Sequence, residues 1–282
     1  MRVVVAGLGD VGGRAAATLA AAGHEVVGVR RSDTAGPPGV TMVRGDLTDD
    51  TLVGRLPEDV DALLVTVSSD GRDPDLYRAA YLDGPSTLLA GLARRGDDVR
   101  RVLFTSSSAV YGQRDGEWVD EGAPTAPTSP TARVLVEAER AHLDGPFPAT
   151  IVRLTGIYGP GRTRLVDLVR ERRAVVGSTP SWTNRIHAAD AAEALVHLLG
   201  LDDPAPVYVG TDDEPADRAE VYRWLAEHLG VDGPRVDDDE APDRGSKRCS
   251  NALLRSTGWS PAYPTFREGY AQVVASMDEP GA

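Results

Sequence analysis

The chain has 282 residues, a formal net charge of −13 and a single cysteine, Cys249. That length accommodates one large domain, or one domain with a smaller lobe. The negative charge argues against a nucleic-acid partner, because phosphate binding needs a basic surface. One cysteine excludes an intrachain disulfide, no apolar run is long enough to cross a membrane, and the N-terminus does not resemble a signal peptide. We therefore expect a cytoplasmic protein with no membrane partner.

The first predicted elements are a strand, a glycine turn and a helix. Residues 3–5 are three valines, typical of a strand buried on both faces, and residues 14–22 form an alanine-rich helical segment. Between them the glycines follow the G-x-G-x-x-G pattern, which in this context binds the pyrophosphate of a dinucleotide. The alternative is a glycine-rich turn with no ligand. The candidate pyrophosphate-binding residues are Gly7, Gly9, Asp10, Val11 and Gly12.

The second predicted strand, residues 25–29, is followed by Arg30, Arg31 and Ser32. A site specific for NAD usually has an acidic residue here, which holds the ribose 2′-hydroxyl. A guanidinium group instead matches a phosphate. These residues favour NADP over NAD, although NAD stays possible, and the alternative is a solvated pair of charges at a strand end.

Two further strands are predicted before the first long helix. After residues 40–43, Asp46 is positioned to accept a hydrogen bond from an adenine amino group, with Leu47 against the ring. Capping of the next helix by Thr48 or Asp49 is an alternative role for this segment. The buried strand 61–67 ends with Thr66 and Val67, followed by a polar loop at the sheet edge where ligands bind, so both are candidate cofactor contacts.

Residues 75–95 have a long helical pattern, and Gly84-Pro85 predicts a kink or break within it. Strand 99–105 then leads into the hydroxyl-rich run 106–112, which contains Ser107 and Tyr111. Its place at the carboxyl edge of the sheet favours a site, whereas serines in a simple turn are the alternative.

The rest of the chain alternates less regularly. Residues 113–130 are predicted to be an irregular loop that Trp118 packs down, and residues 231–246 a mobile acidic connection. We expect two domains, a dinucleotide-binding domain at 1–155 and a smaller lobe at 156–282 that is interleaved with the end of the sheet. The other predicted helices are 131–143, 164–173, 188–199, 219–229 and one ending near 276, and the other predicted strands are 149–154, 182–187 and 207–209.

Several motifs together resemble the extended branch of the short-chain dehydrogenase/reductase superfamily, the NAD-dependent epimerase/dehydratase family. They are G-L-G-D-V-G at 7–12, G-D-L-T-D at 45–49, S-S-S-A-V-Y-G at 106–112, R-L-T-G-I-Y-G-P-G at 153–161 and R-I-H-A-A-D at 185–190. The resemblance implies an α/β fold, a Rossmann-type doubly wound sheet of seven parallel strands, with a smaller, mostly helical C-terminal lobe on the substrate side.

The same resemblance exposes a departure from the family's chemistry, which uses a Ser or Thr with Tyr-x-x-x-Lys. Ser107 matches the Ser, but Thr131 stands where the Tyr belongs and Leu135 where the Lys belongs. An aliphatic hydroxyl is far less acidic than a phenol, and leucine supplies no cation to lower a pKa or to hold the nicotinamide ribose. These losses resemble an atypical, YeeZ-like subgroup.

The substitute proton donor is therefore open. Tyr111 is the first candidate and Ser107 is a candidate for orienting a carbonyl oxygen, against the alternatives of a packed aromatic ring and a turn hydroxyl. On the substrate side the candidates are Tyr158, Arg162, Arg185 and His187; the arginines would hold an anion, or pair with surface carboxylates.

The histidines and the single cysteine have no metal-ligand spacing, so we expect no metal site. We favour an NADP-dependent oxidoreductase or epimerase-like enzyme acting on an unknown small molecule, with a homodimer possible. The alternative is an NAD(P)-binding sensor or partner-binding module without redox turnover.

Overall fold

The computed structural model describes residues 1–237 and 245–277. These residues form two compact units, each assembled from separate stretches of chain. The first unit comprises 1–110, 127–153 and 192–208, and the described part of the second comprises 111–126, 154–191, 209–237 and 245–277. Residues 111–126 thus group with the second unit, although the expected boundary near 155 places them in the first. Residues 192–208 belong to the first unit.

The first unit is built on a seven-stranded parallel sheet, which confirms the predicted Rossmann-type fold. The chain fills the sheet outward from β1 to β2 and β3, then returns to the other side of β1 with β4. Such a reversal creates a crevice at the carboxyl ends of the strands, where ligands bind. In spatial order the strands are β12 (Val207–Gly210), β7 (Ala149–Leu154), β5 (Arg101–Ser107), β4 (Ala62–Val65), β1 (Arg2–Ala6), β2 (Glu25–Arg30) and β3 (Val40–Arg44).

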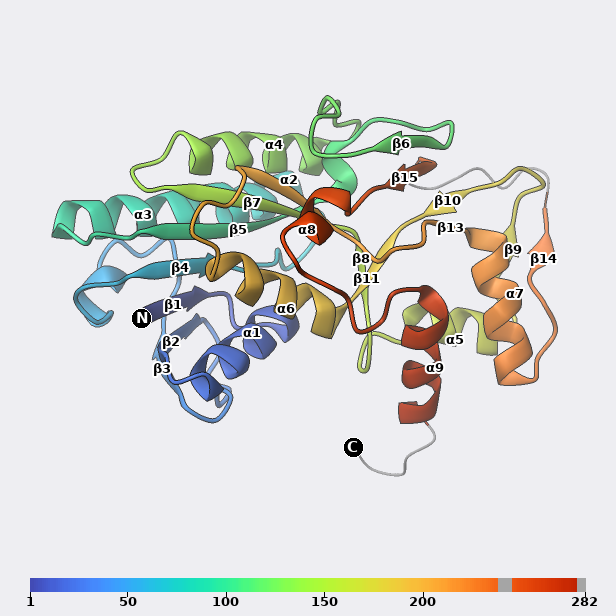
Figure 1. Cartoon of the computed structure of the whole chain (residues 1–282), viewed down its shortest axis with the longest axis horizontal. Helices are drawn as coiled ribbons and strands as arrows, with labels where there is room; N and C mark the ends of the chain where they lie inside the picture. The colour runs from blue at the N-terminus through green and yellow to red at the C-terminus, as the bar shows by residue number, and fades with distance from the viewer. Residues whose placement is uncertain (238–244, 278–282) are drawn as a thin grey trace. The chain divides into compact units, whose positions relative to one another are not determined.

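Helices cover both faces of this sheet (Figure 1). Helices α2 (Pro74–Arg78), α3 (Gly84–Arg95) and α4 (Pro130–Leu143) lie on one side, and α1 (Asp10–Ala21) and α6 (Ala188–Leu199) on the other. Because both faces are covered, the middle of each central strand is apolar, and Val3, Val4 and Val5 are fully buried.

The predicted break in the 75–95 helix is a π-helical turn, η2 (Ala79–Asp83), between α2 and α3. Pro85 has no N–H, and its ring clashes with the carbonyl four residues earlier, that of Tyr81. The turn widens, and the Gly84 N–H donates to the Ala79 carbonyl five residues back. The proline thus produces a π-helical turn rather than an end to the helix. The other short helical turns of this unit are η1 (Leu52–Arg55) and η3 (Ser108–Val110).

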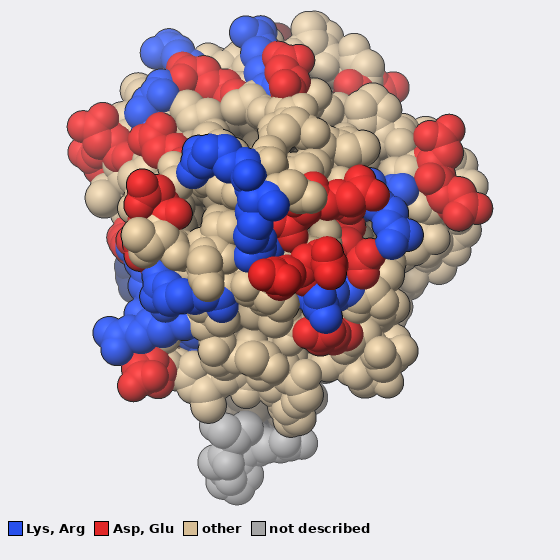
Figure 2. Space-filling view, turned by 90° about the vertical axis from the view of Figure 1, so that its left-hand side faces the viewer, with Lys and Arg blue, Asp and Glu red and all other residues tan. Residues whose placement is uncertain are grey.

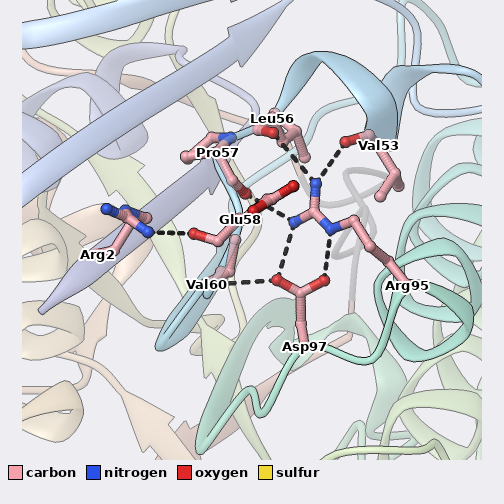
Figure 3. A network of polar contacts seen from close by, with 8 residues as sticks. All are labelled: Arg2, Val53, Leu56, Pro57, Glu58, Val60, Arg95 and Asp97. Carbon is pink, nitrogen blue, oxygen red and sulfur yellow. Dashed lines mark hydrogen bonds and ion pairs between the residues drawn. The ribbon is translucent and has the colours of Figure 1, made fainter.

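An arginine, Arg95, fastens the loop before β4 to the end of α3 (Figure 3). Its guanidinium donates to the carbonyls of Val53, Leu56 and Pro57 and to both oxygens of Asp97. Asp97 in turn accepts from the Val60 N–H at 3.0 Å, and its side chain is only 1% exposed. Burial raises the pKa of Asp97, but the hydrogen bonds from Arg95 and Val60 outweigh it and leave the pKa below its ordinary value.

The second unit combines helices with four two-stranded pairs; the smaller lobe was predicted to be mostly helical, with a short extended segment at 182–187. Its core lies between α5 (Arg164–Arg170), α7 (Arg218–Leu229) and α9 (Phe266–Met277) and includes the fully buried Phe266. The predicted helix 164–173 ends at Arg170, and the backbone at Arg172 is left-handed. The helices are α5 (Arg164–Arg170), α7 (Arg218–Leu229), α8 (Ala252–Ser256) and α9 (Phe266–Met277); the strand pairs are β8 (Gly156–Tyr158) with β11 (Arg185–His187), β10 (Trp182–Thr183) with β13 (Ala216–Asp217), β9 (Val175–Val176) with β14 (Arg235–Val236), and β6 (Glu117–Val119) with β15 (Lys247–Cys249).

The prediction that Trp118 packs down the 113–130 loop is wrong. Its side chain is 59% exposed, and the Arg248 guanidinium lies 5.2 Å from its ring centroid. Pairing of β6 with β15 holds this segment instead, a contact far apart in sequence. Of the predicted mobile connection 231–246, Arg235 and Val236 form β14, while residues 238–244 lie outside the described residues.

The surface carries charges of both signs. The face shown in Figure 2 has arginine and acidic side chains side by side rather than one continuous basic patch. Within residues 1–237 and 245–277, no helix has the length and apolarity needed to cross a bilayer. The same residues contain no cluster of three or more His, Cys, Asp or Glu arranged to bind a metal.

Candidate active site

The glycine turn between β1 and α1 has the geometry of an anion site. Gly7 has a φ of +99°, and a Cβ there would lie 2.7 Å from the Val67 backbone nitrogen. A Cβ at Gly12 would lie 2.3 Å from the Gly7 carbonyl oxygen, so both glycines are needed for packing. A Cβ at Gly9 meets no protein atom within 4 Å, which leaves that side of the turn open to a ligand.

The start of α1 offers backbone donors to such a ligand. Gly9 is the N-cap residue and no side chain caps the helix, so the N–H groups of its first turn, at Asp10, Val11 and Gly12, keep their donor capacity. The Asp10 carboxylate is held by Arg14, whose Nε lies 2.7 Å away. The residues present therefore fit a pyrophosphate.

Thr66 connects this turn to the loop after β4. Its Oγ1 donates to the Gly7 carbonyl at 2.7 Å. Val67 follows it, half-buried against the apolar core of the first unit. Both predicted residues thus lie at the glycine turn, and the Thr66 hydroxyl holds the backbone of that turn.

The ends of β2 and β3 form an open hollow of about 430 Å³ lined by three arginines. Its lining residues are Arg31, Arg44, Gly45, Asp46, Asp49 and Arg55. Arg44 donates from Nε to the Arg31 carbonyl, and Arg55 bonds the Arg44 carbonyl and Asp49. The guanidinium groups of Arg44 and Arg55 are thus held by backbone carbonyls at the hollow, where Asp46 and Asp49 also lie.

Arg31 is already paired with an acid. Its Nη2 lies 2.7 Å from Asp70 Oδ1, and both side chains are more than half exposed. The hydrogen bond and charge of Arg31 hold the pKa of Asp70 below its ordinary value. Arg30, predicted together with Arg31, is not part of the lining of the hollow, and the exposed Ser32 hydroxyl lies 3.2 Å from that of Thr34.

The predicted adenine-binding segment follows β3. One oxygen of Asp46 accepts from the N–H and hydroxyl of Thr48, so this carboxylate shapes its own turn while it lines the hollow. Leu47 is half-buried against the core, where Gly84 allows α3 to approach it closely. Asp49 accepts from the N–H and hydroxyl of Thr51, but the N-cap residue of η1 is Thr51 and no side chain caps that turn, so the alternative of a cap from Thr48 or Asp49 is not observed.

At the carboxyl end of β5, Ser107 is half-buried and its Oγ accepts from the Ala109 N–H at 3.2 Å. The hydroxyl therefore forms the turn, and its proton stays available for a further bond. Beside it, the Ser106 hydroxyl donates to Glu139 of α4 at 2.6 Å, and Glu139 pairs with Arg153 of β7. This buried network fastens α4 to the strand that ends at Ser107.

Helix α4 presents neither a phenol nor an ammonium at the positions where the family's pair would stand. Thr131 lies in its first turn, with its hydroxyl 3.1 Å from that of the N-cap residue Ser129. Leu135 is 4% exposed and packs into the protein. At these two positions the helix therefore offers an aliphatic hydroxyl and a buried apolar side chain.

Tyr111 is the first residue of a segment of the second unit. Its ring is 3% exposed and its hydroxyl donates to the Asp120 carbonyl at 2.8 Å. Lys247, the only lysine of the chain, is buried and points its Nζ at the Tyr111 carbonyl, 3.4 Å away. Burial lowers the pKa of Lys247. In this arrangement the Tyr111 hydroxyl is engaged by its own loop.

Two predicted substrate-side residues, Tyr158 and His187, belong to an aromatic cluster. His187 is 1% exposed, its Nδ1 accepts from the Ala189 N–H at 3.3 Å, and its ring lies 3.9 Å from that of Tyr263. The Tyr158 hydroxyl faces the Thr265 carbonyl at 3.4 Å, and burial raises the pKa of Tyr158. Gly269 permits this packing, because a Cβ there would overlap the Tyr158 hydroxyl.

Arg185 is buried as well, next to an unusual acid. Its Nη2 donates to the Thr183 hydroxyl at 2.6 Å, and its guanidinium lies over Phe266. Asp212 is 1% exposed, and neither of its oxygens makes a hydrogen bond of good geometry in the described structure. Burial raises the pKa of Asp212 to about 8, although Arg185 lowers it in part.

Arg162 is exposed at a second open hollow, of about 450 Å³, in the second unit. Arg164 and Arg173 also line it, together with Asp167 and Glu171. Arg173 is paired with Glu171 at 2.7 Å. Of the two arginines predicted to hold an anion, Arg162 is therefore the accessible one and Arg185 is not.

Sequence reasoning missed three residues of the first unit that bear on the site. Arg44 and Arg55 line the hollow, and Asp70 pairs with Arg31. One signal was present for Arg44: it directly follows the predicted strand 40–43, and in the structure it lies opposite Arg30 in the parallel register. Strand ends that share one sheet edge come together whatever their separation in sequence.

Comparison with known proteins agrees with this architecture. The sequence profile of the NAD-dependent epimerase/dehydratase family matches residues 3–210. A solved structure of a Methylobacillus flagellatus protein of the NAD-dependent epimerase/dehydratase type is 32% identical, with a TM-score of 0.83 and 99% of each chain covered. Protein YeeZ of Escherichia coli is 28% identical over 283 residues, covering 93% of this chain and 96% of that protein.

An enzyme with a defined ligand is also similar. The UDP-glucose 4-epimerase of Thermus thermophilus, solved in complex with NAD, is 26% identical, with a TM-score of 0.81 and 100% of each chain covered. The profile match extends from β1 to the last residue of β12 and so includes every strand of the sheet. The chain is thus a member of the NAD-dependent epimerase/dehydratase family, within the extended and atypical short-chain dehydrogenases/reductases.

Proposed function

We propose that the protein is an NADP-dependent oxidoreductase or epimerase-like enzyme that acts on a small molecule without the usual Tyr-x-x-x-Lys pair. The observation that carries the cofactor preference is the hollow lined by Arg31, Arg44 and Arg55. An arginine fork binds phosphate oxygens in pairs, which suits the 2′-phosphate that distinguishes NADP from NAD. The family relative from Thermus thermophilus, in contrast, was solved with NAD.

Each part of the first unit would then have a defined task. The glycine turn and the first N–H groups of α1 would bind the pyrophosphate, with Thr66 holding the turn in shape. Arg31 and Arg44 would bind the 2′-phosphate. When bound, the nicotinamide supplies hydride chemistry, and Ser107 would orient a substrate oxygen with its free hydroxyl proton.

The substrate is a small molecule of unknown identity. Arg162 is our candidate for binding an anionic group of it, since its guanidinium is exposed at the hollow of the second unit. Arg185 is better placed for a structural role, because its guanidinium is buried against Thr183 and Phe266.

Calorimetric titration with NADPH and NADH tests the cofactor preference. We expect NADPH to bind at least tenfold more tightly, and Arg44→Ser to weaken NADPH about tenfold while leaving NADH unchanged, since one charge-assisted contact is worth roughly 1.4 kcal/mol or more. Arg100→Ser is the matched control, because Arg100 is an exposed arginine before the opposite, amino-terminal end of β5. Equal affinities for the two nucleotides would contradict the preference for NADP.

A second candidate function is cofactor binding without turnover, as in a sensor. The observation that favours it is the combination of Thr131 and Leu135 on α4 with a Tyr111 hydroxyl bound to Asp120. An assay of NADPH oxidation with a panel of carbonyl, imine and nucleotide-sugar substrates distinguishes the enzyme from the sensor. Tight binding with no oxidation on any of them would favour the sensor.

A further inference from the structure

Leu135 replaces the lysine that would hold the nicotinamide ribose, so another donor is needed if NADP(H) is to be held at that end. Tyr81, a tyrosine of the first unit, is a better candidate for this contact than Tyr111, which belongs to the second unit. Tyr81 lies in the π-helical turn η2, which packs against α4, the helix that carries Leu135. A role for Tyr81 in holding the cofactor rests on the proposed function.

The Tyr81 ring is fixed on two sides. It lies 5.1 Å from the ring of Tyr77, and it meets Phe104 of β5 edge-on at 6.4 Å between centroids. Aromatic pairs at these separations are stabilising. The direction of the Tyr81 side chain is thus set by β5 and by its own helix, not by a mobile loop.

The π-helical turn determines where that side chain points. Pro85 displaces the Tyr81 carbonyl from the regular helix, and the widened turn rotates the residues within it relative to α3. Turns of this kind occur often at functional sites. In this chain the turn carries the tyrosine.

The Tyr81 hydroxyl lies at the loop that follows β4. The backbone N–H of Ser69 interacts with its oxygen, while within residues 1–237 and 245–277 no acceptor takes its proton. Burial, with Tyr77 beside it, raises the pKa of Tyr81 to about 12, so the hydroxyl stays protonated at neutral pH. It is a donor without an acceptor, in contrast to Tyr111, whose proton is bound to Asp120.

This loop lies beside the glycine turn on the side away from β2. Val67 contacts the turn at Gly7, and Ser69 is two residues further, a span of at most about 7 Å. In the sheet β4 and β5 lie on one side of β1, whereas β2 and its arginines lie on the other. A dinucleotide whose adenosine half binds at β2 therefore extends its nicotinamide half over β4 and β5.

We propose that the Tyr81 hydroxyl donates a hydrogen bond to the nicotinamide ribose of bound NADP(H), the contact that Leu135 is unable to make. The ribose hydroxyl oxygens are acceptors of the required kind. Tyr81 is then a cofactor-binding residue that the π-helical turn aims at the nicotinamide half of the site.

The test compares two ligands in calorimetric titrations of the full chain. NADPH contains the nicotinamide ribose, and adenosine 2′,5′-bisphosphate contains only the adenosine half with the same 2′-phosphate. Tyr81→Phe removes the hydroxyl and keeps the ring, so the packing on Phe104 survives. We expect Tyr81→Phe to weaken NADPH about three- to tenfold, the range for one hydrogen bond, and to leave the bisphosphate unchanged.

Tyr77→Phe is the matched control on the same stretch of helix, and it should change neither affinity. Unchanged NADPH affinity in Tyr81→Phe would overturn the proposal, and so would an equal loss for both ligands. Absence of binding of both ligands to the unaltered protein would instead overturn the proposed function itself. Fluorine NMR with 3-fluorotyrosine gives an independent readout: the Tyr81 resonance, assigned by its loss in Tyr81→Phe, should shift with NADPH and not with the bisphosphate.

Discussion

Arg31 and Asp70 form an ion pair, with Nη2 and Oδ1 2.7 Å apart, that joins the end of β2 to the loop after β4. Because β1 lies between these two strands, the pair crosses the edge at which the glycine turn stands. The same guanidinium lines the arginine hollow. Asp70 therefore competes with any phosphate for Arg31.

This competition gives a prediction for Asp70→Asn. Removal of the carboxylate charge frees Arg31 and removes the repulsion between Asp70 and the 2′-phosphate. NADPH should therefore bind about two- to fivefold more tightly in low salt. The gain should be smaller at high salt, because the side chains of Arg31 and Asp70 are both exposed and salt screens their charges. NADH, which has no 2′-phosphate, should bind as before. Calorimetric titrations measure both.

Asp144→Asn controls for the change in net charge, because Asp144 is an exposed carboxylate at the end of α4. It should leave both affinities unchanged. A loss of NADPH affinity in Asp70→Asn would show that the carboxylate supports the site rather than competing in it.

The Arg95–Asp97 network of Figure 3 predicts a stability effect. Arg95→Met leaves Asp97, 1% exposed, without its cation and three backbone carbonyls without their donor. Loss of one partner of a fully buried ion pair lowers the free energy of unfolding by about 3–5 kcal/mol. Because Arg95 is partly exposed, we expect a smaller loss of about 2–4 kcal/mol for Arg95→Met. Urea unfolding followed by circular dichroism measures it.

Arg100→Met is the control for this experiment. Arg100 also pairs with an aspartate, Asp61, but its side chain is 72% exposed, so the expected cost is below about 1 kcal/mol. Equal costs for the two variants would show that burial of the network adds nothing. Since the pKa of Asp97 is lowered on folding, its contribution is present above about pH 4 and disappears as the pH falls through the lower value.

For the buried Asp212 we predict a contribution to the free energy of unfolding with the opposite dependence on pH. Its pKa in the folded protein is about 8, well above the ordinary value of 3.8, so folding favours the protonated form. The associated stability is full below about pH 4 and is lost as the pH rises to about 8, at roughly 1.4 kcal/mol for each pH unit. The charge of Arg185 and the backbone N–H of Glu214 oppose this rise in the pKa, while the charges of Glu214 and Asp213 reinforce it.

Asp212→Asn should remove most of that loss, making the free energy of unfolding less dependent on pH between 4 and 8, the interval set by the two pKa values. Asp213→Asn, the exposed neighbour, should retain it. Urea unfolding at a series of pH values gives the comparison. Identical pH profiles for Asp212→Asn and the unaltered protein would exclude Asp212 as the source.

The sequence by itself determined the features that depend on neighbouring residues. The valines of β1, the glycines at 7, 9 and 12 and the alanine-rich start of α1 specify a strand, a turn and a helix through local sterics and burial, and all three form as predicted. Pro85 predicted a break in the helix for an equally local reason, the clash of its ring with the Tyr81 carbonyl. Its form, a π-helical turn, depended on packing against α4 and β5.

Only the tertiary structure decided which side chains meet. Arg44 joins Arg31 because parallel strands end at one edge, and Asp70 reaches Arg31 because β4 returns beside β1. Likewise the β15 segment, rather than Trp118, holds β6. Burial decided the rest: Arg185 and His187 look like ligand-binding residues in the sequence, yet they are enclosed among Phe266, Tyr158 and Tyr263, because exposure is a property of the folded chain and not of the residue type.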